Sequence, residues 1–518
     1  MVRASSRAFV RTGRLAALLA CFELAACGGA GMSDNIDRTP SGSGPERGQL
    51  LSNPPAKVGS YAASDLLPLL GASTPGKELL QLAYTPICIV NVYHFEYETV
   101  GAQGEPATAT GALMVPSGVN SQCSGPRPIV LYAHGTTTDR SYDIASFATS
   151  GNDEGLLLAT VFAAQGYIVI APNYAGYDTS SLDYHPYLDA DQQSKDMIDA
   201  LTAARSALPV LLSPLVSDDH KLFVTGYSQG GFVAMATHRA LQAAGMPVTA
   251  SAPMSGPYAL AAFADAVFLG DVNGGAVINF VLTAESYQHA YGNLYVAPTD
   301  IFAPQYASGI DSLLPSTALR STLYAEGKLP QNALFSSTPP APQYASITPS
   351  TMPANLAPVF ALGFGPSYLV NNTYRLAYLQ DEAANPDGGF PDTTTGLPAA
   401  APASALRQDF KTNDLRNWLP SSPVLLCAGD GDPTVFYLNT QLMQGYWAQY
   451  PPSAPVTVLD VDSAVGADDP YTAIKQGFAA AKAALALTQG QTAVLEAYHT
   501  ELVAPFCLSA VKSFFDSH

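Results

Sequence analysis

The residues best suited to chemistry centre on a serine with a glycine two positions away on each side, Gly226-Tyr-Ser228-Gln-Gly230. A serine on a sharp turn between a strand and a helix is exposed for nucleophilic attack. The chain folds back so tightly there that side chains at the two glycine positions would collide. The apolar run 222–225 predicts a buried strand before the turn, and 232–244 predicts a helix after it. We therefore expect Ser228 to be a nucleophile.

A histidine near the C-terminus is the expected partner of this serine. A serine hydroxyl is a poor nucleophile at neutral pH and needs a base, normally a histidine oriented by a carboxylate. Beyond residue 300 the chain has two histidines, His499 and the terminal His518. Because chain ends fray, His518 is the weaker candidate. We predict His499 as the base, on a loop between a strand end and the last helix.

Two aspartates follow the strand-like run 423–427 and are candidates for the carboxylate, Asp430 and Asp432. The form strand, Gly429, two residues, aspartate places Asp432 at the acid position. Asp430 is better placed to accept hydrogen bonds from the backbone of its own turn. We predict Asp432 as the acid and keep Asp430 as the alternative. Two aspartates after the next strand are weaker candidates, Asp460 and Asp462.

The tetrahedral intermediate of acyl transfer carries a negative oxygen that needs two preorganised hydrogen-bond donors. One expected donor is the backbone N–H of Gln229, directly after the serine. The other should come from a loop after an earlier strand, and His134-Gly-Thr136-Thr137 is such a loop. Gly135 lets the backbone approach the substrate. We predict Thr136 as the donor and Thr137 as the second choice, while His134 shapes the loop and is not the base.

The elements that must position these residues alternate between strand-like and helix-like segments. Residues 87–100 and 107–115 alternate apolar and polar residues around a turn, which predicts a β-hairpin. Apolar residues from Met197 to Leu208 have the spacing of one helix face, and a last helix is expected over 504–515. Further buried strands are predicted at 128–133, 166–171, 248–255, 423–427 and 456–460. This alternation predicts a mostly parallel sheet with helices on its faces.

The alternation dissolves between residues 257 and 412, where Tyr, Phe, Ala and Pro are crowded. We predict one α/β domain, formed by 58–256 and 413–518, that is interrupted by an inserted cap at 257–412. Residues 27–57 are rich in Gly, Ser, Pro and Asn and cannot bury enough apolar area to order themselves. They predict a flexible linker.

In this order the motifs resemble those of the α/β-hydrolase superfamily, and within it the bacterial secreted lipase and esterase group. The resemblance rests on His134-Gly-Thr136, Gly226-Tyr-Ser-Gln-Gly230, Gly429-x-x-Asp432 and His499. It implies an α/β-hydrolase fold with a lid. The roles that it implies are nucleophile for Ser228, general base and acid for His499, orienter for Asp432, and oxyanion donors for Thr136 and Gln229. The cap matches no pattern of the family, so no pocket residues follow from the resemblance.

Composition excludes two classes of protein. Of the 518 residues, 47% are hydrophobic and 13% are charged, which excludes a disordered chain and fits a compact, exported type of protein. The net charge is −19 at pH 7. Nucleic-acid phosphates would be repelled by such a charge, so we expect no nucleic-acid partner.

The N-terminus predicts export. Four arginines precede the apolar run 15–26, which is too short to span a membrane, so residues 1–26 are expected to be a signal peptide. The sequence Ala25-Ala-Cys27-Gly resembles a bacterial lipobox. It implies lipidation of Cys27 and a lipoprotein attached to the outer membrane. The alternative is ordinary cleavage and free secretion to the periplasm or beyond.

Four cysteines remain in the mature chain if Cys27 is lipidated, and an oxidising compartment then allows three pairings. Cys88 and Cys123 flank the opening strands, while Cys427 ends the acid strand and Cys507 begins the last helix. We favour the disulfides Cys88–Cys123 and Cys427–Cys507, and buried free thiols are the alternative. The sequence has no Cys/His cluster with zinc spacing and no Gly-rich phosphate loop, so we expect no metal and no cofactor.

Together these features predict a serine carboxylic-ester hydrolase, a lipase or esterase that forms an acyl-enzyme on a lipid-type ester. The alternatives of the same fold are an aliphatic polyester depolymerase and an amidase or peptidase. A lipid-binding lipoprotein without activity is the alternative from another class, although it would not need a complete catalytic set. Seven cap aromatics would suit an apolar acyl group or equally form the cap's own core: Phe280, Tyr287, Tyr291, Tyr295, Phe360, Phe364 and Tyr368. The oligomeric state stays open.

Overall fold

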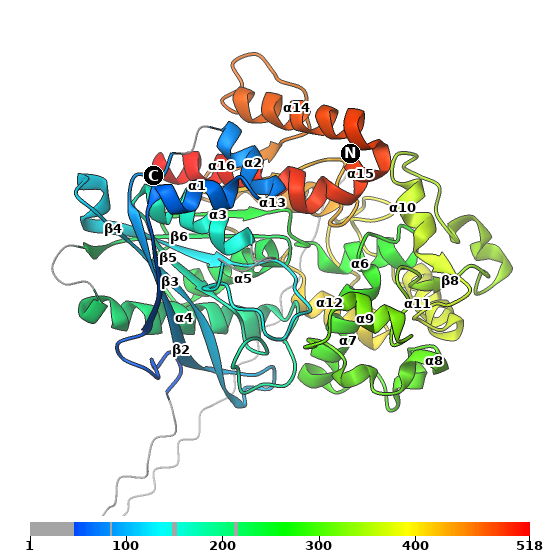
Figure 1. The fold of residues 1–518 in the computed structure, drawn as a ribbon. Helices are drawn as coiled ribbons and strands as arrows, with labels where there is room; N and C mark the ends of the chain where they lie inside the picture. The colour runs from blue at the N-terminus through cyan, green and yellow to red at the C-terminus, as the bar shows by residue number, and fades with distance from the viewer. Residues whose placement is uncertain (1–45, 83–84, 148–152, 212–215) are drawn as a thin grey trace, which may run out of the picture. The chain divides into compact units, whose positions relative to one another are not determined.

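One sheet of nine strands forms the centre of the protein, in the order β1-β2-β3-β5-β4-β6-β7-β10-β11 (Figure 1). The computed structural model describes residues 46–518 apart from 83–84, 148–152 and 212–215. The expected signal peptide 1–26 and the lipidation site Cys27 lie outside the described residues. Neighbouring strands from β5 to β11 run parallel, whereas β1, β2, β3 and β5 pair antiparallel. The sheet is therefore mostly parallel, as the alternation of strands and helices predicts.

The predicted apolar runs coincide with the buried parts of the parallel strands β4, β5, β6, β7 and β10. The predicted hairpin is present, and β2 and β3 pair over their whole lengths; β2 begins two residues later than predicted, and β3 extends beyond its predicted bounds at both ends. The strand bounds are β1 Ala56–Tyr61, β2 Ile89–Val100, β3 Pro106–Ser117, β4 Gly125–Ala133, β5 Ile168–Pro172, β6 Val216–Tyr227, β7 Ala250–Met254, β10 Val424–Ala428 and β11 Val456–Asp460.

Helices cover both faces of this sheet (Figure 1). One buried apolar cluster lies under α1, α2, α3, α14 and α16, and another joins α4 and α5 to the segment that follows β7. The helices of the α/β part are α1 Ala63–Leu70, α2 Thr74–Gln81, α3 Asp153–Val161, α4 Ala190–Leu211, α5 Gln229–Ala243, α13 Leu438–Gln449, α14 Thr472–Gln489, α15 Gln491–Ala497 and α16 Ala504–Asp516, with short 3-10 turns η1 Ser121–Cys123 and η2 Ala163–Gln165. None of the described helices has the length and apolar character needed to cross a membrane.

The segment between β7 and β10 adds no strand to the main sheet. It forms the lobe drawn in green and yellow in Figure 1. Its elements are α6 Leu260–Phe268, α7 Ala276–Tyr291, η3 Pro298–Asp300, α8 Pro304–Ala307, η4 Ile310–Ser312, α9 Arg320–Ala325, β8 Phe335–Ser336, η5 Pro342–Ile347, α10 Ala357–Leu362, β9 Phe364–Gly365, α11 Asn372–Ala384 and α12 Ala405–Asn413. That this segment acts as a cap stays a prediction.

Buried ion pairs hold the helices of this lobe together. Arg407 of α12 bonds to Asp265 of α6 at 2.8 Å and to Asp381 of α11 at 2.9 Å. The guanidinium of Arg407 is 3% exposed, so removing one partner would leave an uncompensated buried charge. These pairs fix α6, whose side chains reach the site described below.

The folded part begins before residue 58, where the composition favours a linker. Gly48 N–H donates to the Glu98 carbonyl, and Arg47 bonds to Asp199 at 3.0 Å. Residues 56–61 then form β1 at the edge of the sheet. The composition of the predicted linker does not reveal these contacts, because most of them are backbone hydrogen bonds and do not depend on apolar side chains.

Both favoured disulfides are present in the structure. Cys88, just before β2, is bonded to Cys123 of η1, which follows β3, and Cys427 of β10 is bonded to Cys507 of α16. The second disulfide ties the strand that precedes Asp432 to the helix that follows His499.

Candidate active site

Ser228 lies at the turn between β6 and α5, with backbone angles φ 60° and ψ −123°. A positive φ is strained for a non-glycine residue and is typical of a nucleophile elbow. The neighbouring strand β4 explains the two glycines. A Cβ at Gly226 would lie 2.5 Å from the Ala133 carbonyl oxygen, and one at Gly230 would lie 1.9 Å from it. A Cβ at Gly226 would also lie 2.3 Å from the Gly230 carbonyl oxygen, so the motif avoids collisions both with β4 and within the turn itself.

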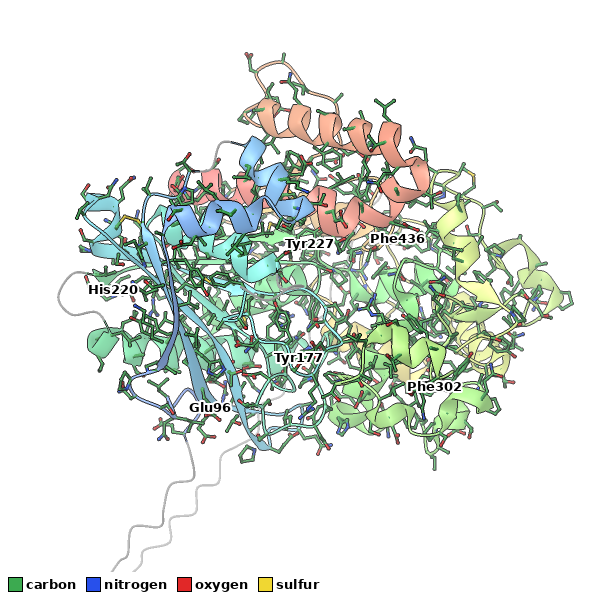
Figure 2. All side chains as sticks on the ribbon, in the orientation of Figure 1. Glu96, Tyr177, His220, Tyr227, Phe302 and Phe436 are labelled. Atoms are coloured by element: carbon green, nitrogen blue, oxygen red, sulfur yellow. A yellow bond between two sulfur atoms is a disulfide. The ribbon has the colours of Figure 1, made fainter. Side chains whose placement is uncertain are left out.

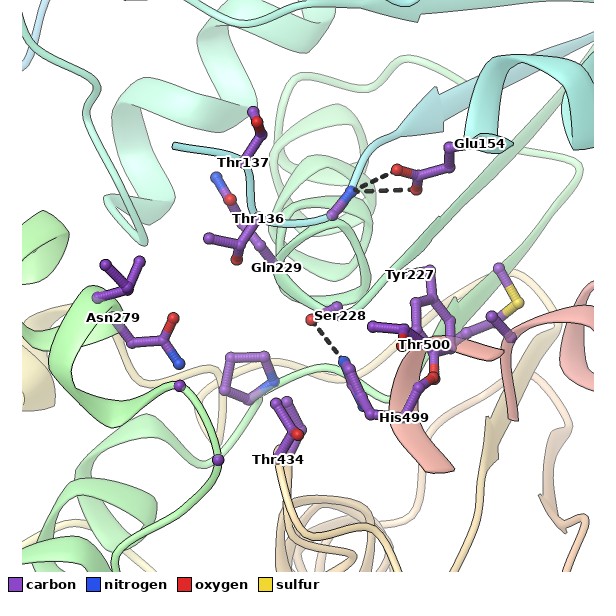
Figure 3. A pocket seen from close by; sticks show the side chains of 18 of the residues that line it. Thr136, Thr137, Glu154, Tyr227, Ser228, Gln229, Asn279, Thr434, His499 and Thr500 are labelled. Atoms are coloured by element: carbon purple, nitrogen blue, oxygen red, sulfur yellow. Dashed lines mark hydrogen bonds between the residues drawn. The ribbon is translucent and has the colours of Figure 1, made fainter. Parts of the chain in front are cut away.

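The structure joins Ser228, His499 and Asp432 through two hydrogen bonds. His499 Nε2 is 2.8 Å from Ser228 Oγ (Figure 3). His499 Nδ1 is 2.6 Å from Asp432 Oδ2. Because a carboxylate can only accept, Nδ1 carries the proton, and Nε2 is free to accept the serine proton. His499 and Asp432 are 3% and 1% exposed, whereas Ser228 is partly exposed. This geometry can move a proton from serine to histidine while the aspartate stabilises the resulting imidazolium.

Of the aspartates considered, Asp432 is the one that meets the histidine. Its second oxygen, Oδ1, accepts the N–H groups of Thr434 at 2.8 Å and Val435 at 3.1 Å, which fixes the carboxylate. Asp430 is exposed, and its own N–H donates to Asp460. Asp462 bonds to Lys482 and to the Tyr498 hydroxyl instead.

His499 lies in a π-helical turn, Tyr498–Val503, and the expected loop is not found. This π-helical turn η6 continues α15 directly and runs into α16. Single π-helical turns often occur at functional sites, where they displace one side chain from regular helical spacing. Helical periodicity in the sequence could not show this, because a π turn interrupts the period.

Tyr227 was not singled out by the sequence, although it lies inside the serine motif. Its hydroxyl donates to the His499 carbonyl, and the two rings are 5.0 Å apart. Tyr227 thus connects the elbow to the C-terminal helices (Figure 2). Tyr498 connects the C-terminal helices to the turn that carries Asp432. Its hydroxyl donates to Asp462 at 2.7 Å and accepts the Gly431 N–H at 3.0 Å.

The loop 134–137 follows β4 and passes beside the elbow, because Ala133 pairs with Gly226 in the sheet. His134 is fully buried, and burial lowers its pKa to about 4, which suits a loop-shaping residue. Thr136 Oγ1 lies 3.0 Å from the Tyr187 hydroxyl. In Figure 3, Thr136 and Gln229 lie on the opposite side of Ser228 from His499. That is the side where an oxyanion hole is needed, and the role of the two N–H groups stays a prediction.

Gln229 is held by a buried histidine. Its Nε2 is 2.7 Å from His185 Nε2, and His185 Nδ1 is 2.9 Å from the Ala175 carbonyl. Burial lowers the pKa of His185 to about 3, so the ring is neutral. With its proton on Nδ1, the ring accepts from Gln229. Nothing in the local sequence indicates this contact.

A cavity of about 1260 Å³ opens onto Ser228. Side chains of the α/β part and of the lobe after β7 line it together, and its wall is mostly apolar. Of the seven aromatic residues named from the sequence, Phe280 is the one that lines this cavity. The others include core residues of the lobe: Tyr287 and Phe360 are at most 1% exposed.

One group of side chains has the composition of a metal site within the described residues. His94, Asp143 and Asp178 place ligand-type atoms within 4.8 Å of one another. However, His94 Nε2 bonds directly to Asp178 Oδ2 at 2.8 Å, and the same oxygen accepts the Thr110 hydroxyl at 2.7 Å. The hydrogen bond that the His94 ring donates to Asp178 raises the pKa of His94, as an ion pair does. Hydrogen bonds donated by His94 and Thr110 to Asp178 therefore explain why these side chains lie together.

The fold and the serine turn together define an α/β-hydrolase fold. Comparison with known structures agrees. Esterase LipA of Xanthomonas oryzae, a rice cell wall degrading esterase, superposes as its G231F mutant with a TM-score of 0.65 at 26% identity, covering 91% of this chain and 99% of that chain. A second LipA structure gives 0.61 at 27% identity, covering 88% and 99%. A Legionella pneumophila protein at 19% identity, with a TM-score of 0.61 and coverage of 90% and 98%, shares the fold.

The comparison with family models covers a smaller part of the chain than the structural comparison does. The model of the prolyl oligopeptidase family matches residues 157–254, which include Ser228 but neither Asp432 nor His499. No curated protein matches the chain. Taken together, the comparisons support a hydrolase.

Proposed function

We propose that this protein is a serine carboxylic-ester hydrolase that works through an acyl-enzyme. The observation that carries the proposal is the hydrogen-bonded series Ser228–His499–Asp432 at the wall of a large, mostly apolar cavity. The 26% identity with an esterase over nearly the whole chain supports the choice of an ester.

The reaction follows from the geometry. Ser228 Oγ attacks the ester carbonyl carbon while His499 Nε2 takes the serine proton, and Asp432 stabilises the positively charged ring. The negative oxygen of the intermediate is bound by the backbone N–H groups of Thr136 and Gln229. His499 then gives its proton to the leaving alcohol. In the second half, water loses a proton to His499, attacks the acyl carbon and releases the acid and Ser228.

The experiment is hydrolysis of p-nitrophenyl esters from acetate to palmitate by the wild type and by Ser228→Ala. Hydrolysis that Ser228→Ala abolishes supports the proposal, and the preferred chain length distinguishes a lipase from an esterase with a shallow pocket. A polyester film tests the depolymerase. A folded wild type that neither hydrolyses any ester nor reacts with a fluorophosphonate probe would refute the enzyme and favour a lipid-binding protein.

Peptide-bond cleavage is the second candidate, because the matched segment 157–254 belongs to the prolyl oligopeptidase family model. Peptide p-nitroanilides in the same assay distinguish it. Faster turnover of anilides than of the matched esters would favour the peptidase.

We also propose that the protein is exported and attached to a membrane through Cys27. Two disulfides support export, since such bonds persist in oxidising compartments. Mass spectrometry of the mature N-terminus distinguishes a lipidated Cys27 from free secretion.

A further inference from the structure

Glu154 is a carboxylate beside the site that the reaction above does not use. It lies in the first turn of α3, is partly exposed to the cavity, and accepts the Tyr132 hydroxyl at 2.6 Å. Its two oxygens also lie 3.1 and 3.3 Å from the backbone nitrogen of Gly135, which donates to them (Figure 3). Glu154 therefore binds the peptide group between His134 and Gly135. The next peptide carries the Thr136 N–H, and its carbonyl, Gly135 O, lies 2.6 Å from His134 Nδ1.

The same loop is fixed at other points by tyrosine hydroxyls. Tyr174 donates to the His134 carbonyl at 3.0 Å, and Tyr177 donates to the Thr137 carbonyl at 2.8 Å. Between these two anchors, Glu154 is the described group that accepts the Gly135 N–H. Among the described residues the Thr136 N–H donates to none, so it is available to a substrate oxygen.

The loop passes between the carboxylate and the nucleophile. A Cβ placed on Gly135 would lie 3.8 Å from Glu154 Oε2 and 3.8 Å from Ser228 Cβ. A rotation of the peptide at Gly135 would therefore move the next N–H, that of Thr136, relative to the serine. Because an oxyanion donor must be aligned before charge develops, the group that fixes this peptide affects the barrier and not the binding of the ground state.

We propose that Glu154 is a positioning residue, which holds the Gly135 peptide so that the Thr136 N–H points at the oxygen that becomes negative during catalysis. The proposal rests on the ester hydrolysis proposed above. The Gly135 N–H needs an acceptor oxygen from residue 154, but that oxygen need not carry a charge. Burial raises the pKa of Glu154 to about 7, and both protonation states keep an oxygen for the Gly135 N–H. A glutamine at this position should therefore work.

The test compares Glu154→Gln, which keeps an acceptor, with Glu154→Leu, which removes it. Glu326→Leu is the matched control, because Glu326 is an exposed glutamate at the end of α9 and does not line the cavity. For each variant kcat and KM are measured with p-nitrophenyl butyrate, and Ki is measured for a trifluoromethyl ketone, which forms an oxyanion with the serine. Circular dichroism and urea unfolding show that the compared proteins are folded.

We expect Glu154→Leu to lower kcat roughly 10- to 100-fold, with KM within about twofold and Ki raised by the same factor as kcat falls. Glu154→Gln should stay within about threefold of the wild type, and Glu326→Leu should have the same kcat, KM and Ki as the wild type. A folded Glu154→Leu with unchanged kcat and Ki overturns the proposal, and so does a loss that appears only in KM. If Glu154→Leu does not fold, Glu154→Met removes the acceptor at a similar volume.

The two proposals fail in different ways. A wild type that does not hydrolyse esters and does not react with fluorophosphonate refutes the proposed function itself. An active wild type with an equally active Glu154→Leu refutes the role of Glu154 alone.

Discussion

The two disulfides should differ in their effect on activity although they contribute similarly to stability. Cys88–Cys123 spans a sequence separation of 35 residues, and Cys427–Cys507 spans 80. In the chain-entropy model, opening them lowers the free energy of unfolding by roughly 4 and 4.5 kcal/mol at 25 °C. The two double cysteine-to-alanine variants should therefore have nearly equal stability, which makes each a control for the other.

Their places in the fold are different. The second disulfide joins β10, from which Asp432 follows, to α16, which continues the turn that carries His499. Without it, the direct covalent link between β10 and α16 is lost, and the acid and the base are held by their own hydrogen bond of 2.6 Å, by the contacts of Tyr498 and by the apolar packing of α16. A displacement of about 1 Å in such an arrangement can lower the rate roughly 100-fold. We expect Cys427→Ala/Cys507→Ala to lower kcat between about 10- and 100-fold, and Cys88→Ala/Cys123→Ala to leave it nearly unchanged.

The assay is urea unfolding for stability, followed by kcat for ester hydrolysis under conditions in which both variants are more than nine-tenths folded. The rate of fluorophosphonate labelling gives the reactivity of Ser228 independently of turnover. If the two variants have equal kcat and equal labelling rates at equal stability, the second disulfide does not position the acid and base, and the reasoning is wrong.

Three further predictions concern single side chains. Asp432→Asn should lower kcat roughly 10⁴-fold, with no such loss in Asp430→Asn; similar losses in both would contradict the geometry. Tyr498→Phe leaves the Gly431 N–H without its acceptor and should lower the free energy of unfolding, measured in urea, by about 1–3 kcal/mol. Burial raises the pKa of Glu285 to about 9, so the folded state holds its proton between pH 4.5 and 9 where the unfolded chain has lost it. The free energy of unfolding should thus fall as pH rises through this window. Glu285→Gln should reduce this dependence on pH, measured by urea unfolding at pH 5, 7 and 9. A variant with the same pH dependence as the wild type would show that Glu285 is not the cause.

The sequence by itself determined the opening hairpin, the buried strands of the parallel part of the sheet, the three helices α4, α5 and α16, and the serine turn. Each of these follows from local physics. Buried parallel strands need continuous apolar runs, and the glycines at 226 and 230 are required because Cβ atoms there would overlap the backbone of β4. The order of the motifs along the chain was also sufficient to predict the α/β-hydrolase fold, because parallel strands place their carboxyl ends at one edge of the sheet.

The sequence named Ser228, His499 and Asp432 as partners by motif and order, but only the tertiary structure shows that their polar groups meet. The bond between Ser228 and His499 joins residues 271 positions apart, and the choice between Asp430 and Asp432 depends on a turn held by two backbone N–H groups. Local propensity carries no information on such distances. The same holds for the cap aromatics, since packing selects Phe280 for the cavity and buries Tyr287 elsewhere, although both are large and apolar. Glu154 shows the limit most clearly, because a glutamate at a helix start is common in any sequence, and only the fold brings it to the Gly135 peptide.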